Sequence, residues 1–136
     1  MRAAVEFIIP GTPVAWHRPR FRGKRGFKDA DDRNFQVLVR HHAAQAVQAL
    51  PFQSSGEFTF RWRLSGAFAV ELICMVPNRT RRDVDNLAKN ILDGLTGVIW
   101  GDDSHVVDLS VKKRLAANPY TWVRVERIGD NLDAVS

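Results

Sequence analysis

The sequence predicts a single α/β domain in which a mixed β-sheet packs against two main helices. The chain has 136 residues, which is enough for one hydrophobic core and too few for two. Some segments alternate apolar and polar residues, others repeat apolar residues at helical spacing, and Gly, Pro and Asn separate them. No internal linker, repeat or low-complexity segment breaks this pattern. We therefore expect one domain over residues 1–136, with a frayed tail at residues 129–136.

The N-terminal part is expected to contain a strand, a helix and a second strand. Residues 3–9 form a short apolar run that is typical of a strand. Over residues 32–50 apolar side chains recur at intervals of three and four, which predicts a helix with Asp31 and Asp32 as candidate caps. Residues 58–64 alternate apolar and polar side chains, which predicts a strand with its arginines on one face.

The C-terminal part is expected to contain a buried strand, a helix and two further strands. Residues 68–76 are almost continuously apolar, as in a well-buried strand. A helix is predicted over residues 86–96, and Gly97 is a natural terminator. Alternating apolar residues predict strands over residues 105–113 and 120–128.

Composition limits the class of protein. The net charge of +5 fits a nucleic-acid partner. No apolar stretch reaches the length of a membrane span, and the N-terminus lacks a signal-peptide pattern. The one cysteine, Cys74, lies in an apolar run and is expected to be a buried strand residue; a single cysteine excludes an intramolecular disulfide and fits a reducing compartment. We expect a cytoplasmic protein.

Basic side chains gather in two clusters. The first lies in a segment whose proline and glycines predict a loop or ribbon, with aromatic residues interleaved, and it consists of Arg18, Arg20, Arg22, Lys24, Arg25 and Lys28. The second, directly before an acidic motif, consists of Arg79, Arg81 and Arg82. Arginine binds phosphate and aromatic rings stack on bases, so both clusters are candidate DNA-binding residues. For the first cluster, a solvated basic loop with buried aromatics is an equal alternative.

The acidic motif is the most informative feature of the chain. Asp83 and Asp85 precede the expected helix, Lys89 lies about one turn inside it, and Asp102 and Asp103 follow it after a short return. Mg²⁺ prefers oxygen ligands, usually one or two carboxylates completed by water and substrate phosphate. Acids concentrated in an otherwise basic chain therefore indicate a divalent-cation site that meets a polyanion, as in a metal-dependent phosphodiesterase.

Local geometry favours a shared site for these acids. On extended chain, residues i and i+2 point the same way, whereas on a helix they diverge by about 200°. Because extended chain is expected up to the helix start, Asp83 and Asp85 are predicted to face one cation, and Asp85 is also placed to cap the helix. The helix N-terminus directs free N–H groups toward bound phosphate. The return turn is expected to bring Asp102, Asp103 or both beside them.

Structural roles are the alternative for each acid pair, since D-x-D occurs as a cap and turn and Asp-Asp as an exposed turn. An EF-hand loop is excluded, because Ala88 and Gly94 occupy its glycine and glutamate positions. No G-x-x-x-x-G-K loop for a nucleotide cofactor is present. His41 and His42 lack a metal-binding spacing and are interpreted as a surface pair.

These segments resemble the RusA family of Holliday-junction resolvases, the crossover junction endodeoxyribonucleases. The resemblance is carried by residues 77–89, 92–95 and 100–108, with shorter matches at residues 11–13, 18–20 and 111–113. It implies a RusA-like fold and a small homodimer, of bacterial or phage origin, that cuts four-way DNA junctions symmetrically with Mg²⁺ or Mn²⁺. It makes Asp83, Asp85 and Asp103 the essential metal-binding carboxylates and Lys89 the essential lysine. Asp102 also matches, and the choice between Asp102 and Asp103 as main ligand stays open.

The chemistry of these residues agrees with the resemblance. Carboxylates would hold one or two Mg²⁺ ions that activate water, and Lys89 would stabilise the transition state or orient the water. Two symmetric cuts need two active sites, which favours a twofold dimer. Two alternatives stay open. One is a nuclease of the same scaffold with broader branched-DNA targets, and the other is a junction-binding protein without catalysis. A mere binder gains nothing from acids beside DNA.

Overall fold

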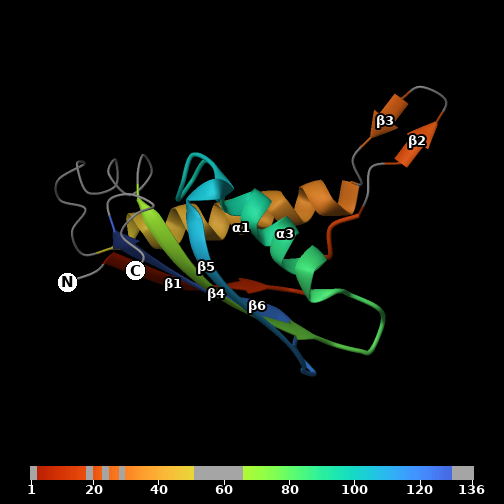
Figure 1. The fold of residues 1–136 in the computed structure, drawn as a ribbon. Coiled ribbons are helices and arrows are strands. Elements are labelled where there is room, and N and C mark those ends of the chain that lie inside the picture. Colours follow the sequence, from red (N-terminus) through yellow and green to blue (C-terminus); the bar gives the residue numbers. More distant parts are fainter. Residues whose placement is uncertain (1–2, 18–19, 23–24, 28–29, 51–65, 130–136) are drawn as a thin grey trace.

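A computed structural model describes residues 3–17, 20–22, 25–27, 30–50 and 66–129 of the chain. Within these residues, a mixed four-stranded sheet and two helices confirm the predicted α/β fold (Figure 1). In chain order the elements are β1 (Ala3–Pro10), β2 (Arg20–Arg22), β3 (Arg25–Phe27), α1 (Ala30–Gln48), β4 (Ala67–Val76), α3 (Val84–Leu95), the 3-10 turn η1 (Asp103–His105), β5 (Val106–Leu115) and β6 (Tyr120–Gly129).

The main sheet has the strand order β1-β6-β4-β5. Strand β6 pairs antiparallel with both β1 and β4, whereas β4 and β5 are parallel and are joined through α3. Parallel strands need such a crossover, because the chain must return to the same end of the sheet before the second strand begins. Strand β5 therefore starts beside the beginning of β4 and ends beside the end of β4, from Phe68 opposite Val106 to Val76 opposite Leu115.

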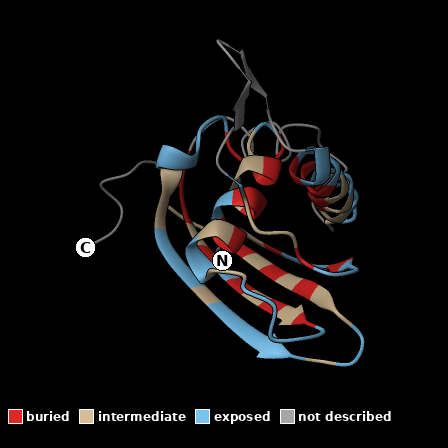
Figure 2. Cartoon of the chain, turned by 90° about the vertical axis from the view of Figure 1, so that its right-hand side faces the viewer, coloured by how far each residue is buried: buried red, intermediate tan, exposed pale blue. Residues whose placement is uncertain are grey.

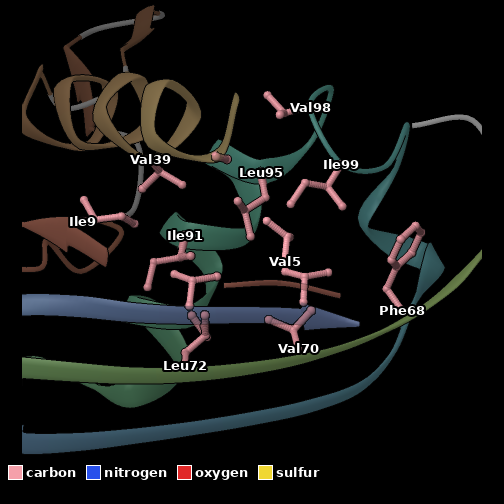
Figure 3. Close-up of a cluster of buried hydrophobic side chains, with 14 of the residues drawn as sticks. Val5, Ile9, Val39, Phe68, Val70, Leu72, Ile91, Leu95, Val98 and Ile99 are labelled. Carbon is pink, nitrogen blue, oxygen red and sulfur yellow. The ribbon is translucent and has the colours of Figure 1, made fainter. Parts of the chain in front are cut away.

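Both helices pack on one face of the sheet, and the core lies between the two layers (Figures 1 and 3). Strand β4 contributes a side chain to this core at every second position, and each of these side chains is buried: Phe68, Val70, Leu72, Cys74 and Val76. Helix α1 faces them with Val39, and α3 with Ile91 and Leu95. At about 25 cal/mol per Å² of buried apolar surface, this contact is the main source of stability for both helices.

Strand β5 differs from the strands inside the sheet in its exposure. Most of its residues are exposed or partly exposed, whereas buried and partly buried positions alternate along most of β6 (Figure 2). Within the described residues β5 has a neighbour on one side only, which is β4. Two of its leucines, Leu109 and Leu115, are 43% and 52% exposed.

Most predicted elements are found, with shifted ends. The ribbon β2–β3 confirms that the first basic segment is not a helix. The prediction that Asp31 or Asp32 caps helix α1 is wrong, because α1 begins at Ala30 and both residues lie in its first turn. The predicted strand at residues 58–64 and the predicted fraying beyond Gly129 lie outside the described residues.

Several single-residue predictions are also confirmed. Cys74 is fully buried on β4, and burial raises the pKa of its thiol to about 12. Gly97 follows the last turn of α3 with a φ of 91°, a conformation that glycine adopts without strain. His41 and His42 lie on α1, the first exposed and the second partly exposed.

No helix in the described ranges is both long and apolar enough to cross a membrane.

Candidate active site

Asp83 is the N-cap residue of α3, and its backbone is extended with φ −74° and ψ 137°. Its carbonyl oxygen accepts a hydrogen bond from the amide of Leu87 at 3.0 Å, but its carboxylate makes no capping hydrogen bond. The carboxylate instead accepts two hydrogen bonds of 3.3 Å from the guanidinium of Arg81, and these raise the pKa of Arg81. The Asp83 side chain is 43% exposed. Its oxygens are therefore not used to cap the helix, and a cation could reach them in exchange for the exposed Arg81 side chain.

Asp85 lies inside the first turn of α3 and is exposed. The prediction of extended chain as far as Asp85, with the helix starting near residue 86, is wrong because α3 begins at Val84. A carboxylate in the first helical turn is stabilised by the helix dipole and the free N–H groups. Both acids nevertheless lie at the N-terminal end of α3, where a phosphate group can also approach the free N–H groups.

Lys89 lies one helical turn after Asp85, so both side chains leave α3 on the same side. Its ammonium nitrogen is 3.7 Å from Asp93 Oδ2 and 5.0 Å from the centroid of the Trp16 ring. The Lys89 side chain is 46% exposed. Lys89 is thus held between a carboxylate of its own helix and an aromatic ring of the N-terminal segment.

Residues 14–17, here called the strap, lie against α3 and the first turn of α1. The amide of Trp16 donates to the carbonyl oxygen of Asn86 at 2.9 Å. The Asn90 side chain donates from Nδ2 to the carbonyl oxygen of Val14 at 2.9 Å and accepts at Oδ1 from Nε2 of Gln36 at 2.8 Å. Asn90 is fully buried, so it connects the strap, α1 and α3 without contact with water.

A second contact holds the C-terminal end of the strap. The backbone amide of His17 donates to Asp32 Oδ2 at 2.8 Å, and its Nδ1 lies 2.9 Å from Asp32 Oδ1. Asp32 is fully buried in the first turn of α1, while the His17 side chain is 49% exposed. In the sequence, the strap ends directly before the first basic cluster.

Sequence reasoning missed this set of positioning residues. Asn90 carried a usable signal, because it lies three residues after Leu87 and one before Ile91, on the apolar side of the predicted helix. A polar residue on a buried face needs a partner. The identity of that partner could not be read from local spacing, since Val14 is 76 residues away.

Asp102 and Asp103 lie at the other end of α3, after a tight turn. The turn is fixed by Trp100, which is almost fully buried, donates from Nε1 to Thr96 Oγ1 at 3.0 Å, and packs its ring 5.4 Å from that of Phe68. Both acids are exposed. The hydroxyl of Ser104 donates a hydrogen bond to Asp102, and this bond lowers the pKa of the Asp102 carboxyl.

The two acid pairs are therefore separated by the length of α3 (Figure 1). The expectation that the return turn brings Asp102 or Asp103 beside Asp83 and Asp85 is wrong for a single chain. The reason is the parallel pairing of β4 and β5, which forces η1 to lie beside the start of β4 while Asp83 follows its end. Among the described residues, no three His, Cys, Asp or Glu side chains gather closely enough to hold a metal ion.

Each pair still has the donor chemistry of a magnesium site. Exposed carboxylates are hard oxygen ligands, and Mg²⁺ is commonly bound by one or two of them together with water and substrate phosphate. Beside Asp83 and Asp85 lie a helix N-terminus and Lys89, which can bind the substrate phosphate. The carboxylates are therefore suitable ligands for Mg²⁺, although one chain places them as two separate pairs.

Basic side chains lie near the first acid pair, Asp83 and Asp85. Arg82 donates to Asn78 Oδ1 and to the Thr80 carbonyl oxygen, and the Lys113 ammonium donates to the Arg82 carbonyl oxygen at 2.7 Å. A cleft opens between the chain after β4 and the end of β5, and it is lined by Val76, Asn78, Arg79, Thr80, Lys113, Arg114 and Leu115. Three of these side chains are cations, which is suited to a phosphate backbone.

The first basic cluster is only partly described. Arg20, Arg22 and Arg25 belong to the ribbon β2–β3, whose backbone is described. The other members, Arg18, Lys24 and Lys28, lie outside the described residues. Their proposed contact with DNA stays a prediction.

Known proteins resemble this chain in sequence. The family model for endodeoxyribonuclease RusA matches residues 10–126. The crossover junction endodeoxyribonuclease RusA of Escherichia coli (strain K12) is 47% identical over 45 residues, which is 32% of this chain and 38% of that protein. The protein of the same name from Enterobacteria phage 82 matches with the same identity and coverage. The uncharacterized protein YqaN of Bacillus subtilis (strain 168) is 41% identical over 49 residues, which is 36% of this chain and 34% of that protein.

The pairwise alignments thus span well under half of each curated relative, whereas the family model spans most of this chain. The matched region contains every element from the end of β1 to most of β6, with both acid pairs and Lys89. The chain belongs to the RusA endodeoxyribonuclease family.

Proposed function

We propose that this protein is a Mg²⁺-dependent endodeoxyribonuclease that resolves four-way DNA junctions by paired, symmetric nicks in recombination and repair. It would act as a homodimer in the cytoplasm of a bacterium, encoded by the host or by a phage. The main support is that the family match includes exposed carboxylates, a lysine and a helix N-terminus in one place, beside arginines that suit phosphate. Mn²⁺ is expected to replace Mg²⁺, since both accept carboxylate ligands.

In this proposal the metal-binding carboxylates are Asp83 and Asp85 at the start of α3 and Asp103, with Asp102, beyond its far end; one chain does not bring the two pairs to a single ion. When bound, the ion supplies a polarised water and offsets the charge that develops on the scissile phosphate. Lys89 donates a hydrogen bond to that phosphate or orients the attacking water. The free N–H groups of the first turn of α3 bind a non-bridging phosphate oxygen.

Arg81 has a second role in the same proposal. It is paired with Asp83 and its side chain is 89% exposed, so the pair is weak and easily exchanged. If Asp83 were to hold a cation, Arg81 would be free to bind DNA phosphate together with Arg79 and Arg82. Binding should consequently weaken steeply as salt rises.

Two alternatives predict different results. A nuclease with broader targets would cut flaps and forks as well as four-way junctions. A binding protein without catalysis would bind junctions and cut none of them. The second alternative leaves the exposed acids at the start of α3 without a purpose, because negative charge beside DNA weakens binding.

The test is cleavage of an end-labelled four-way junction, a flap, a fork and a linear duplex of the same sequence. Each is incubated with Mg²⁺, with Mn²⁺ and with EDTA. We expect paired nicks at symmetric positions in the junction alone, which are lost in EDTA and in Asp83→Asn. The matched control is Glu71→Gln, because Glu71 is an exposed acid on β4, away from α3, and its loss should leave cutting unchanged. Junction binding without cutting in either metal would contradict the proposal.

A further inference from the structure

We infer that the cleft at the ends of β4 and β5 binds one base of the DNA strand that is cut, and that the side chain of Asn78 recognises this base. The expected base is a guanine near the scissile phosphate. This inference rests on the proposed function and deepens it, because it gives the nuclease a sequence preference. It follows from the size of the cleft, its apolar side, its cations and the hydrogen bonds of Asn78.

The cleft is small and has an apolar side. Its volume is about 240 Å³, whereas pockets for drug-sized ligands have about 300–1,000 Å³. Val76 at the end of β4 is buried, and Leu115 opposite it on β5 is 52% exposed. The amide of Ala116 donates to the Val76 carbonyl oxygen at 2.9 Å, which holds the two strand ends together. This surface suits the flat face of a single base, and a duplex does not fit into the cleft.

The cleft also has a cationic side. It is lined by the exposed side chains of Arg79, Lys113 and Arg114. Nη1 of Arg114 donates to the Lys113 carbonyl oxygen at 3.1 Å, and the Lys113 ammonium donates to the Arg82 carbonyl oxygen at 2.7 Å. These bonds position both side chains and use only part of their donors. A nucleotide unit, which has a flat base and an anionic phosphate, matches both sides of the cleft.

Asn78 contributes hydrogen-bond donors to this cleft. Its Oδ1 accepts from the Thr80 amide at 3.1 Å and from Nη1 of Arg82 at 3.0 Å. Because both partners are donors, they fix the orientation of the Asn78 amide group. Its Nδ2 keeps two N–H donors, which find no acceptor within the described part of the chain. None of the residues that line the cleft carries a carboxylate, so a ligand meets donors.

Donors of this kind favour guanine. The N7 and O6 atoms of guanine are two neighbouring acceptors, whereas adenine and cytosine each present an amino group at the corresponding edge. Arginine on guanine is also the most common base-specific contact in DNA complexes. A base at the branch point of a junction, where the stack is interrupted, can turn into a cleft at lower cost than a base inside a duplex.

Arg82 connects the cleft with the first acid pair. Its side chain donates to Asn78, its carbonyl oxygen accepts from Lys113, and the next residue is Asp83. A base held by Asn78 thus places the DNA strand against the residue that directly precedes the acidic motif. Nicks should therefore lie at a set distance from the recognised guanine.

The first test is a titration of the isotope-labelled full chain with dGMP, dAMP, dCMP and dTMP in the absence of metal, followed by NMR. We expect dGMP to shift the side-chain amide signals of Asn78 and to bind at least about fivefold more tightly than dCMP. Asn78→Asp keeps an acceptor for Thr80 and Arg82 but replaces the donor group by a second acceptor. This variant should prefer dCMP, because an acidic side chain accepts from the amino group of cytosine.

The matched control is Asn118→Asp. It makes the same chemical change at an exposed asparagine of the turn between β5 and β6, which does not line the cleft. This variant should keep the preference for dGMP.

The second test maps nicks in a pool of four-way junctions whose base pairs near the branch are randomised. In the wild type and in Asn118→Asp, guanine should be enriched at one fixed position near the nick. In Asn78→Asp, cytosine should be enriched at that position.

Equal binding of the four nucleotides, or a preference for dGMP that persists in Asn78→Asp, would overturn the base-binding cleft. Nicks without a base preference, or with the same preference in Asn78→Asp, would also overturn it and leave the proposed nuclease intact. If the wild type cuts no junction, the nuclease proposal fails, while the nucleotide titration still decides whether the cleft recognises a base.

Discussion

The ammonium group of Lys89 lies over the indole ring of Trp16, 5.0 Å from the ring centroid. The ring comes from the strap and the lysine from α3, and the Trp16 amide is bonded to Asn86 on the same helix. Asp93 holds the ammonium from a second direction at 3.7 Å. A long side chain that is 46% exposed thus has a restricted position, which is set partly by residues outside the acidic motif.

Replacing Trp16 should therefore loosen the position of the Lys89 ammonium group while the lysine itself stays present. Cation–π contacts contribute about 0.5–2 kcal/mol, so we expect Trp16→Ala to lower the single-turnover rate of junction cleavage about tenfold. Trp16→Phe keeps an aromatic face and should lose about threefold or less. The rate is measured at saturating protein with a labelled junction, so that weaker binding does not contribute.

A double-mutant cycle separates positioning from general damage. In a Lys89→Ala background, Trp16→Ala should add almost no further loss, because the ring then has no ammonium to position. If the two substitutions reduce the rate independently of each other, Trp16 does not act through Lys89.

Asn90 should be among the most sensitive polar residues for stability. Asn90→Ala removes the amide nitrogen that donates to the Val14 carbonyl oxygen and the amide oxygen that accepts from Gln36 Nε2. Both hydrogen bonds are lost at a fully buried position. An unsatisfied buried polar group costs about 1–3 kcal/mol, and we expect the free energy of unfolding in urea to fall by about 2–4 kcal/mol. The control is Asn78→Ala, since Asn78 is exposed and should cost about 1 kcal/mol or less. Equal costs for the two variants would contradict the importance of the strap.

Gly94 marks the closest approach of α3 to α1. A Cβ atom at this position would lie 2.8 Å from Val39 Cβ and 3.1 Å from the Gln36 carbonyl oxygen. Alanine normally stabilises a helix interior by about 1 kcal/mol relative to glycine, but here the clash should reverse the sign. We expect Gly94→Ala to lower the free energy of unfolding by about 1–3 kcal/mol. Gly101→Ala, where no atom lies within 4 Å, should change it by about 0.5 kcal/mol or less. A stabilised Gly94→Ala protein would contradict the close approach of α3 to α1 at this position.

The thiol of Cys74 should be inert in the folded protein. It is fully buried on β4, and burial raises its pKa to about 12, so very little thiolate exists at neutral pH. We expect a coloured disulfide reagent at pH 8 to label the native protein only at the rate of unfolding and to label it at once in urea. Fast labelling without denaturant would mean that β4 is accessible from solvent.

The elements of the fold could be predicted because their signals are local. The apolar run of β4 and the spacing of Leu87, Ile91 and Leu95 on α3 follow from which faces are buried. The first acid pair could also be located, since the motif directly precedes a predicted helix. Its detailed geometry could not, because the start of α3 differs by two residues and this moves Asp85 from extended chain into the helix.

The rest of the site depends on long-range pairing that spacing does not encode. Asn90 bonds to a carbonyl 76 residues away, and His17 to an acid 15 residues away. The position of Asp103 depends on whether β5 pairs with β4 in the parallel or the antiparallel sense. An antiparallel strand would have begun beside Asp83, whereas the parallel strand begins at the far end of α3.

The proposed junction nuclease should first be tested by a single-binding cleavage assay on a supercoiled plasmid that extrudes a cruciform. If the protein makes two symmetric nicks before it dissociates, Mg²⁺ should convert the plasmid to linear molecules whose ends map opposite one another at the cruciform base. EDTA and Asp83→Asn should leave the plasmid supercoiled. A plasmid that stays supercoiled in Mg²⁺ and Mn²⁺, while a mobility shift shows the cruciform bound, would contradict the proposed junction nuclease.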